Sequence, residues 1–363
     1  MKAKIIIILS ITFSAFWLIS CSEKKLATIG VYYFDGWSGK HQLADNPGEP
    51  WAKNAPTHQT RRMIEEFPDR EPVWGWRNDS PEIMKRQIDL AAENGVDFFL
   101  FCWYWKNDRG AINVDALKND YHHTSMELYL KAPNKNKLKY CLLVANHGGA
   151  EIIGKENWMD AVRYWSEYFR DPQYVTVDGK PLVILFGAGD EISDEDLEAM
   201  QRTAKEEGFK DGISIAGCGA PARQKSGFTH STHYNVVPGY IDKSEEHKYQ
   251  EIVDATKAEW IGREDQPHIP VLTAGWDKRP WEGPNGQGTG EGWYYPDSSP
   301  DQFKNFLTDA IQWMDNNPAK TTKERLVLIY AWNEMGEGGY LVPTKGDPEA
   351  AKLKMIKAVA EGK

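Results

Sequence analysis

From about residue 28 onward, short uninterrupted runs of apolar residues alternate with longer segments whose apolar positions recur at helical spacing. The apolar runs cover residues 28–34, 96–103, 139–145, 182–186, 212–217, 234–238, 269–274 and 326–331. The helical segments cover residues 81–94, 122–131, 157–170, 194–207, 244–261, 300–316 and 347–361. Continuous apolar runs indicate strands that are buried on both faces, as in a parallel sheet. The alternation predicts an α/β fold, a single (β/α)₈ TIM barrel.

A doubly wound open sheet is the alternative fold, but no Gly-x-Gly-x-x-Gly follows a predicted strand. Two long polar insertions, residues 36–77 and 276–299, each follow a predicted strand. A barrel gathers such βα loops at the carboxyl ends of its strands, where active sites are built. We therefore expect residues 28–363 to form one catalytic domain with long loops around a cleft.

The first 20 residues have the pattern of a secretory signal. Lys2 and Lys4 precede an apolar run over residues 5–19, and small residues lead to Cys21. An uncleaved anchor is the alternative, although the run is short for a membrane-spanning helix. The residues before Cys21 resemble the lipobox of bacterial lipoproteins. That resemblance implies a lipidated Cys21, a short tether over residues 21–27 and a membrane-anchored protein of the bacterial cell envelope, on its periplasmic or cell-surface side.

The composition of the chain bears on the kind of ligand or partner that the protein binds. The 363 residues include 53 acidic and 43 basic side chains, a net charge of −10, which argues against a nucleic-acid partner. The chain is rich in aromatic residues, with 15 Trp and 16 Tyr, which suit either a core or platforms for sugar rings. After Cys21 three cysteines remain, Cys102, Cys141 and Cys218, each in an apolar run. We expect them to be buried and unpaired.

The segment with the clearest chemical signal is Ala-Trp-Asn-Glu-Met-Gly-Glu-Gly-Gly-Tyr, residues 331–340, at the end of the last predicted strand. It holds Glu334 and Glu337 among glycines, which let a chain turn tightly and approach a ligand. Glycoside cleavage uses two carboxyl groups beside the reacting sugar. One of them must hold a proton near neutral pH, which apolar neighbours and a nearby like charge favour. The alternative is a solvated loop with two ordinary surface glutamates.

The Asn-Glu-x-x-Glu-Gly order of this segment resembles the signature of glycoside hydrolase family 99, the endo-α-mannosidase family. It resembles the WbsX-like relatives of that family still more closely. Three further segments agree: Val-Tyr-Tyr at 31–33, Gly-Val-Asp-Phe-Phe at 95–99 leading into Cys-Trp-Tyr-Trp at 102–105, and Ala-Gly-Trp-Asp at 274–277 followed by Arg-Pro. The four matches occur in the family's order and are spread along the chain, so the resemblance spans nearly all of residues 28–345.

The resemblance implies a mechanism. Glu334 would be the base on the sugar 2-hydroxyl, giving a 1,2-anhydro sugar, and Glu337 the general acid and then base at the glycosidic oxygen. It also implies retention of configuration, no metal, and an α-mannoside among the candidate substrates. The sequence departs from the family at Met335, Gly336 and residues 146–149, so we expect a different pocket around the same carboxyl groups.

Aromatic side chains at strand ends are the candidates for sugar stacking. Tryptophans in predicted loops or at strand ends are Trp37, Trp51, Trp74, Trp76, Trp103, Trp105, Trp276, Trp281, Trp293 and Trp332. The residues that we expect to contact the substrate are Tyr33, Trp37, Trp103, Tyr104, His147, Trp276, Asp277, Trp332 and Asn333. For His147, a satisfied structural histidine is the alternative.

We expect no metal and no cofactor. His122-His123 and His230-x-x-His233 lack an acidic or cysteine partner at the usual spacing. The acidic residues 194–196 stand at the start of a predicted helix, where they favour the helix dipole.

Together these observations favour a secreted, lipid-anchored glycoside hydrolase that acts as a monomer on a polysaccharide or glycan. A glycosyltransferase is the first alternative, since WbsX-like proteins often carry that label. No phosphate-cradling loop is visible, and sugar nucleotides are scarce outside the cytoplasm. A non-catalytic glycan-binding lipoprotein is the second alternative, and the carboxyl pair argues against it.

Overall fold

The computed structural model describes residues 25–189, 192–240, 246–283, 285–286, 290 and 292–362. Within these ranges, eight parallel strands form a nearly closed barrel in the order β7-β6-β5-β3-β2-β1-β9-β8. The strands are β1 (Thr28–Tyr33), β2 (Phe98–Trp103), β3 (Lys139–Ala145), β5 (Lys180–Phe186), β6 (Ser214–Cys218), β7 (His230–Thr232), β8 (Val271–Thr273) and β9 (Leu326–Tyr330). The predicted (β/α)₈ barrel is thereby confirmed. The predicted signal and Cys21 lie outside the described residues.

The barrel closes between β7 and the segment that leads into β8. Ser231 forms a parallel bridge with His268. The Ser231 amide donates to the carbonyl of Pro267 at 3.1 Å, and the Ile269 amide donates to the carbonyl of Ser231 at 2.9 Å. These bonds continue the ladder around the ring, so the carboxyl ends of all eight strands meet at one mouth.

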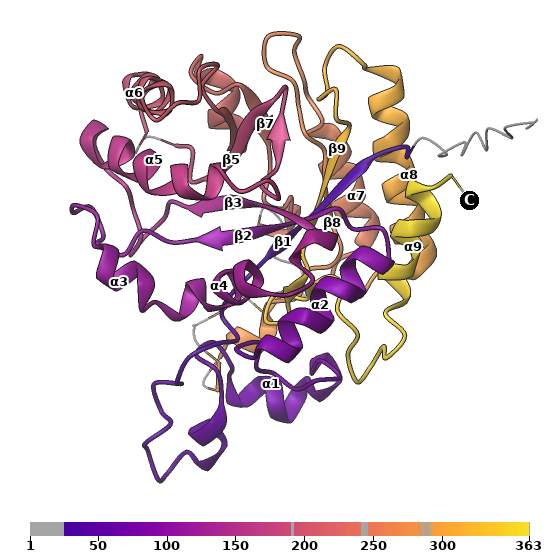
Figure 1. Cartoon of the computed structure of the whole chain (residues 1–363). Helices are drawn as coiled ribbons and strands as arrows, with labels where there is room; N and C mark the ends of the chain where they lie inside the picture. Colours follow the sequence, from indigo (N-terminus) through magenta and orange to yellow (C-terminus); the bar gives the residue numbers. More distant parts are fainter. Residues whose placement is uncertain are drawn as a thin grey trace, which may run out of the picture.

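Helices surround the strands, as Figure 1 shows. The α-helices are α1 (Arg61–Glu66), α2 (Pro81–Glu93), α3 (Val114–Lys118), α4 (Thr124–Lys131), α5 (Lys155–Phe169), α6 (Asp194–Glu206), α7 (Tyr249–Ala258), α8 (Pro300–Asn316) and α9 (Ala351–Ala360). The 3₁₀ helices are η1 (Pro50–Asn54), η2 (Pro68–Arg70), η3 (Tyr121–His123), η4 (Lys135–Lys137), η5 (Ala220–Gln224), η6 (Pro238–Tyr240) and η7 (Arg279–Trp281). Ser80 and Ser299 cap α2 and α8, each followed by Pro at the first position, so the predicted helix starts are confirmed. No helix within these ranges is long and apolar enough to span a bilayer.

The sixth strand lies earlier in the chain than predicted. The apolar run over residues 234–238 is not a strand; β7 is His230–Thr232, a polar segment. Buried hydroxyl groups replace apolar packing there, because Thr232 Oγ1 donates to the carbonyl of Ile269 at 2.9 Å and Ser231 Oγ lies 2.9 Å from His268 Nδ1. The hydroxyl side chains of β7 are hydrogen-bonded to the neighbouring strand segment. The strand therefore needs no apolar residues, and no apolar run marks it in the sequence.

The core fills the barrel and the space between barrel and helices. All six residues of β2 are buried, as are Trp158 and Trp165 on α5. Cys102, Cys141 and Cys218 are unpaired, as expected; Cys102 and Cys141 are buried, whereas Cys218 is half-buried instead of buried. Two short additions complete the sheets: β4 (Thr176–Val177) pairs antiparallel with β5, and β10 (Asn333–Glu334) pairs antiparallel with β11 (Gly339–Tyr340).

Candidate active site

The two candidate carboxyl groups belong to a small hairpin at the mouth of the barrel. The chain leaves β9 at Tyr330, forms β10, turns, and returns as β11. The turn is closed by the Glu337 amide, which donates to the carbonyl of Glu334 at 3.1 Å. Gly338 has φ +78°, and a side chain on Gly336 would collide with the ring of Trp281. The glycines of this segment therefore permit a turn that carries both glutamates to the mouth.

Asn333 fixes the hairpin to the end of β1. Its Oδ1 accepts from the Phe34 amide at 2.8 Å, and its Nδ2 donates to the Phe34 carbonyl at 2.7 Å. The Trp37 indole donates to the Asn333 carbonyl at 2.7 Å. Because Asn333 is 1% exposed, these bonds form in a protected environment and hold Glu334 in place.

Glu334 and Glu337 line one cavity of about 570 Å³. Its walls come from the carboxyl ends of several strands: Phe34 after β1, Tyr104 and Lys106 after β2, residues 147–150 after β3, Phe186 on β5 and Tyr234 after β7. Tyr121 and His122 of η3, and Trp281 of η7, complete it. This is the place where (β/α)₈ enzymes keep their active sites.

Two tyrosines hold the carboxyl groups. The Tyr234 hydroxyl donates to Glu334 Oε1 at 2.6 Å, and the Tyr330 hydroxyl donates to Glu337 Oε2. Glu334 is 4% exposed. Its second oxygen, Oε2, is buried and has no hydrogen-bond partner among the described residues. A buried polar atom without a partner is costly, and a ligand hydroxyl would satisfy it.

Burial raises the pKa of both carboxyl groups. The charge of Glu337 raises the pKa of Glu334 further, and the hydrogen bond from Tyr234 opposes this rise. The hydrogen bond from Tyr330 and the charge of Lys278 act against the rise at Glu337. Because two buried like charges repel, the pair favours a state with one proton over a state with two carboxylates. One carboxyl group is then ready to give a proton and the other to take one.

The wall near η3 is formed by a paired lysine and neutral imidazoles. Lys106 Nζ lies 2.9 Å from Asp120 Oδ2, and His122 Nδ1 lies 3.1 Å from Asp120 Oδ1. Burial raises the pKa of Asp120, but hydrogen bonds from His122 and Lys106 outweigh it and lower the pKa to about 2. Burial lowers the pKa of His58 to about 4 and also lowers that of His122. At neutral pH these rings offer neutral donors and acceptors to a ligand.

Of the residues predicted to contact a substrate, the structure places Tyr104 and His147 in this cavity beside the two glutamates. Their ring centroids lie 6.2 Å apart, and His147 is exposed. Both follow strand ends, the criterion on which they were predicted.

The remaining predicted contacts do not line the cavity and need correction. They are Tyr33, Trp37, Trp103, Trp276, Asp277, Trp332 and Asn333, each 6% exposed or less. Trp332 donates its indole N–H to Gln87 Oε1 at 2.7 Å, and Trp103 stacks on His123 with 5.5 Å between ring centroids. Large aromatic rings gain most from complete burial, so these tryptophans are packed behind the site instead of facing it.

Asp277 is likewise a structural residue. Both of its oxygens bond Arg279, at 2.8 and 2.9 Å, and Oδ2 also pairs with Arg70. Burial raises its pKa, but the Arg279 hydrogen bond and the Arg70 charge outweigh burial, so the pKa lies below its usual value. An ionised carboxylate held by two arginines ties the loop after β8 to the loop after β1.

Sequence reasoning missed Tyr234, Tyr330, Lys278 and the η3 residues Tyr121 and His122. Tyr234 was hidden by the misplaced sixth strand. Tyr330 is the last residue of β9, so its place at a strand end was the available signal. The His122-His123 pair was considered only as a metal site. The described part of the chain contains no group of three or more His, Cys, Asp or Glu side chains arranged to hold a metal ion.

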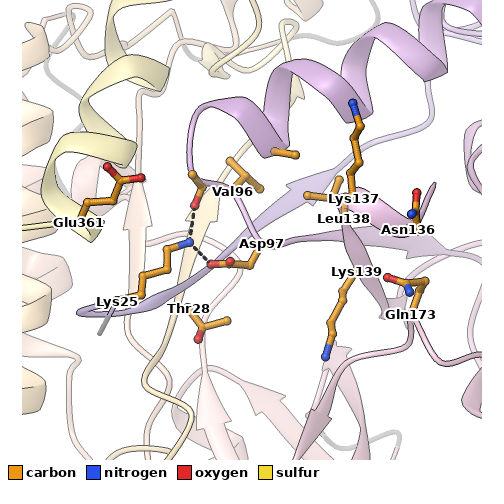
Figure 2. A pocket seen from close by; sticks show the side chains of 12 residues that line it. Lys25, Thr28, Val96, Asp97, Asn136, Lys137, Leu138, Lys139, Gln173 and Glu361 are labelled. Carbon is orange, nitrogen blue, oxygen red and sulfur yellow. Dashed lines mark hydrogen bonds and ion pairs between the residues drawn. The ribbon is translucent and has the colours of Figure 1, made fainter. Parts of the chain in front are cut away.

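A larger hollow of about 740 Å³ lies at the opposite end of the barrel (Figure 2). Lys25 lies there, and its ammonium donates to Asp97 Oδ2 at 2.6 Å and to the Gly95 carbonyl at 2.8 Å. Asp97 Oδ2 also accepts from the Ile29 amide at 2.7 Å. These bonds join the start of β1 to the start of β2, so the groups that line this hollow serve as a structural junction.

Solved structures with the same fold were found by comparison. The GH99 endo-alpha-mannosidase from Bacteroides thetaiotaomicron superposes with a TM-score of 0.59 at 14% identity, over 92% of this chain and 96% of that one. A structure described as a glycoside hydrolase-like protein gives the same TM-score and identity, over 92% and 94%. These likenesses support the (β/α)₈ barrel fold.

Sequence comparison gives the family. The model of the family described as Glycosyltransferase WbsX matches residues 76–355, so the chain belongs to the WbsX family. Two relatives described as uncharacterized protein WxcX, from two strains of Xanthomonas campestris pv. campestris, are 23% identical over 297 residues. The match covers 73% of this chain but 39% of those relatives.

Proposed function

We propose that the protein is a glycoside hydrolase that cleaves a polysaccharide or glycan. The observation that carries the proposal is the pair of buried carboxyl groups, Glu334 and Glu337, in one cavity at the mouth of the barrel, each held by a tyrosine. Burial raises the pKa of both acids, which favours the protonated acid that glycoside cleavage requires. A protein that only bound glycans would gain little from two buried acids.

The first step forms an intermediate without a covalent bond to the protein. Glu334 removes the proton of the sugar 2-hydroxyl while that oxygen attacks C1. The glycosidic bond breaks, and Glu337 gives its proton to the departing oxygen. The product of this step is a 1,2-anhydro sugar together with the released part of the glycan.

Water completes the reaction. Glu337 removes a proton from the water as the water oxygen attacks C1, the C1–O2 bond breaks, and Glu334 returns its proton to O2. The net reaction is hydrolysis with retention of configuration. The unpartnered Oε2 of Glu334 supports its role, because a sugar hydroxyl would satisfy that atom.

The surroundings of the pair suit a sugar. Tyr104, Phe186 and Trp281 offer flat faces, and His147 offers a hydrogen-bonding ring at the rim. The likeness in fold to a GH99 endo-alpha-mannosidase makes α-mannosides the first substrates to try. Residues 146–149 depart from the family pattern on this wall, so the panel should extend beyond mannosides.

Sugar transfer is the second candidate function, because the family is described as a glycosyltransferase. The two functions differ in their products. The purified protein is incubated with a panel of polysaccharides and α-mannosides, and separately with sugar nucleotides plus acceptor glycans. A hydrolase releases new reducing ends, and the first-formed anomer, observed by NMR, keeps the configuration of the substrate. Transfer from a sugar nucleotide without release of reducing ends would instead establish the transferase.

We also propose that the protein acts in the bacterial cell envelope, anchored through a lipid on Cys21. The support is the pattern of residues 1–21. In that location polysaccharides are at hand and sugar nucleotides are not, which agrees with hydrolysis.

A further inference from the structure

Arg70 is the last residue of η2 and belongs to the long insertion after β1, residues 36–77. The chain around it pairs with the segment that follows β11. Residues 69–73 and 343–346 are joined by backbone hydrogen bonds of 2.8–3.0 Å that run in both directions. The insertion is thereby held against the chain that leaves the β10–β11 hairpin, and Arg70 lies within this paired segment.

The guanidinium of Arg70 joins the hairpin to the loop after β8. Its Nη1 donates to the carbonyl of Met335 at 3.1 Å and to the carbonyl of Asp277 at 2.9 Å, and its Nη2 pairs with Asp277 Oδ2. Met335 stands between the two candidate glutamates in the sequence. The side chain of Arg70 is 12% exposed, so these charge-assisted bonds form largely away from solvent, where they are strong.

A second contact holds the other end of the same turn. The Asp277 amide donates to the carbonyl of Glu337 at 2.6 Å. A Cβ on Gly338 would come within 2.7 Å of the Asp277 amide nitrogen, so the hairpin and the loop after β8 are in close backbone contact. Arg70 and Asp277 together therefore hold the carbonyls of Met335 and Glu337.

Removal of Arg70 would not leave a buried charge unpaired. The Asp277 carboxylate also accepts two bonds from Arg279, at 2.8 and 2.9 Å. Without Arg70 the carboxylate keeps this partner, whereas the carbonyl of Met335 loses the bond from the guanidinium. The effect should therefore fall on the position of the hairpin more than on the stability of the fold.

We propose that Arg70 is a positioning residue for Glu334 and Glu337. It holds the carbonyl of Met335 directly and that of Glu337 through Asp277, and thereby fixes the distance and orientation between the two carboxyl groups. The inference rests on the proposed function, in which both acids act on one sugar. Arg70 does not line the cavity of the pair, so it acts through the backbone of the hairpin and not on the substrate.

The test compares two substitutions of Arg70 with the parent chain on the polysaccharides and α-mannosides of the panel above. Arg70→Met removes the charge and all of these bonds, whereas Arg70→Lys keeps the charge but has one nitrogen in place of the fork. Arg77→Met is the matched control. Arg77 belongs to the same insertion and likewise bonds an aspartate, Asp79, and two backbone carbonyls, those of Gly39 and Asn54, all within residues 36–79. Thermal melting checks that each variant is folded at the assay temperature.

We expect Arg70→Met to lower kcat by about 10- to 10²-fold at an unchanged KM, the scale of a reacting group displaced by about 1 Å. Arg70→Lys should recover only part of kcat, and Arg77→Met should keep it. In Arg70→Lys the acidic limb of the pH profile of kcat/KM should move to lower pH. Burial and the charge of Glu337 raise the pKa of Glu334, and both effects weaken when the pair loosens. Partial unfolding alone would lower kcat without moving this limb.

Four results would overturn the inference and leave the proposed function standing: an unchanged kcat in Arg70→Met, full recovery of kcat in Arg70→Lys, an unchanged pH profile, or an equal loss of kcat in Arg77→Met. A parent chain that cleaves no glycan would overturn both the inference and the proposed function.

Discussion

Two tyrosine hydroxyls and the charge of one lysine oppose the rise in pKa that burial causes at Glu334 and Glu337. Tyr234 and Tyr330 each donate to one carboxyl group, and the charge of Lys278 acts on Glu337. Burial works against all three by raising the pKa of both acids. These opposing effects set the pKa values of the two acids. Replacing one of the neighbouring side chains should therefore shift a pKa in a direction that can be stated in advance.

Lys278→Met should move the alkaline limb of the pH profile of kcat/KM to higher pH. The lysine charge lowers the pKa of Glu337, so its removal raises that pKa. If Glu337 is the general acid, activity needs its protonated form, and that form then persists to higher pH. Lys323→Met, at an exposed lysine, is the control. A shift of the acidic limb alone would assign Glu337 to the role of base.

The loss of activity in Glu334→Gln and in Glu337→Gln should depend differently on the leaving group of the substrate. A variant that lacks the general acid keeps activity on an aryl glycoside whose nitrophenol departs without protonation. We expect Glu337→Gln to lose at least about 10²-fold on an unactivated glycan but far less on the aryl glycoside. Glu334→Gln should lose activity on both. The reverse pattern would exchange the two roles.

For single residues, the sequence predicts the two carboxyl groups, Glu334 and Glu337, better than it predicts the side chains that surround them. Glu334 and Glu337 stand out because carboxyl groups among Trp, Met and Gly are unusual for a solvated loop. Tyr104 and His147 are predicted because they follow strand ends. The burial of Trp103, Trp276 and Trp332 was not predicted, because a tryptophan at a strand end can pack backward or face the cleft, and only the tertiary contacts decide.

The β10–β11 hairpin is the element on which the site depends. Asn333 joins it to Phe34 through two hydrogen bonds, and Trp37 adds a third bond at the Asn333 carbonyl. The geometry of the carboxyl pair is therefore tied to the end of β1, at the opposite end of the chain from β9. Local sequence patterns do not predict such a contact between segments far apart in the chain. They also do not predict β7, because its polar side chains form hydrogen bonds with neighbouring segments and leave no apolar run.

Asn333→Ala should destabilise the fold by about 1–3 kcal/mol, because it leaves the buried N–H and C=O of Phe34 without partners. Urea denaturation measures the change in the free energy of unfolding. Asn119→Ala, which removes an exposed side-chain bond to the Asp115 carbonyl, is the matched control and should have little effect. Equal stability of the Asn333 variant and the parent chain would show that the hairpin is held by other contacts.

On the scale of the whole molecule, the carboxyl pair and the first described residue lie at opposite ends of the barrel. The carboxyl pair lies at the carboxyl mouth of the barrel, whereas Lys25, the first described residue, lies at the opposite end (Figure 2). Under the proposed lipid anchor on Cys21, we expect the mouth with the carboxyl pair to face away from the membrane. The overall (β/α)₈ order was predictable because each buried strand and each amphipathic helix leaves its own local pattern.

Cys21→Ala should release the protein from membranes if the proposed anchor exists. Cell fractions are extracted with Triton X-114, and the protein is followed by immunoblot. The parent chain should enter the detergent phase and the variant the aqueous phase, since an acyl chain contributes about 0.8 kcal/mol per buried CH₂. Identical partitioning of the two chains would contradict the lipid anchor and leave the hydrolase proposal untouched.

The central claim is that Glu334 and Glu337 cleave glycosidic bonds. The measurement that tests it most directly is the release of reducing ends from the polysaccharide and α-mannoside panel by the purified protein, beside Glu337→Gln. The account predicts release by the parent chain and a loss of at least about 10²-fold in the variant, the scale of a lost general acid. Equal release by both chains, or no release from any glycan, would contradict it.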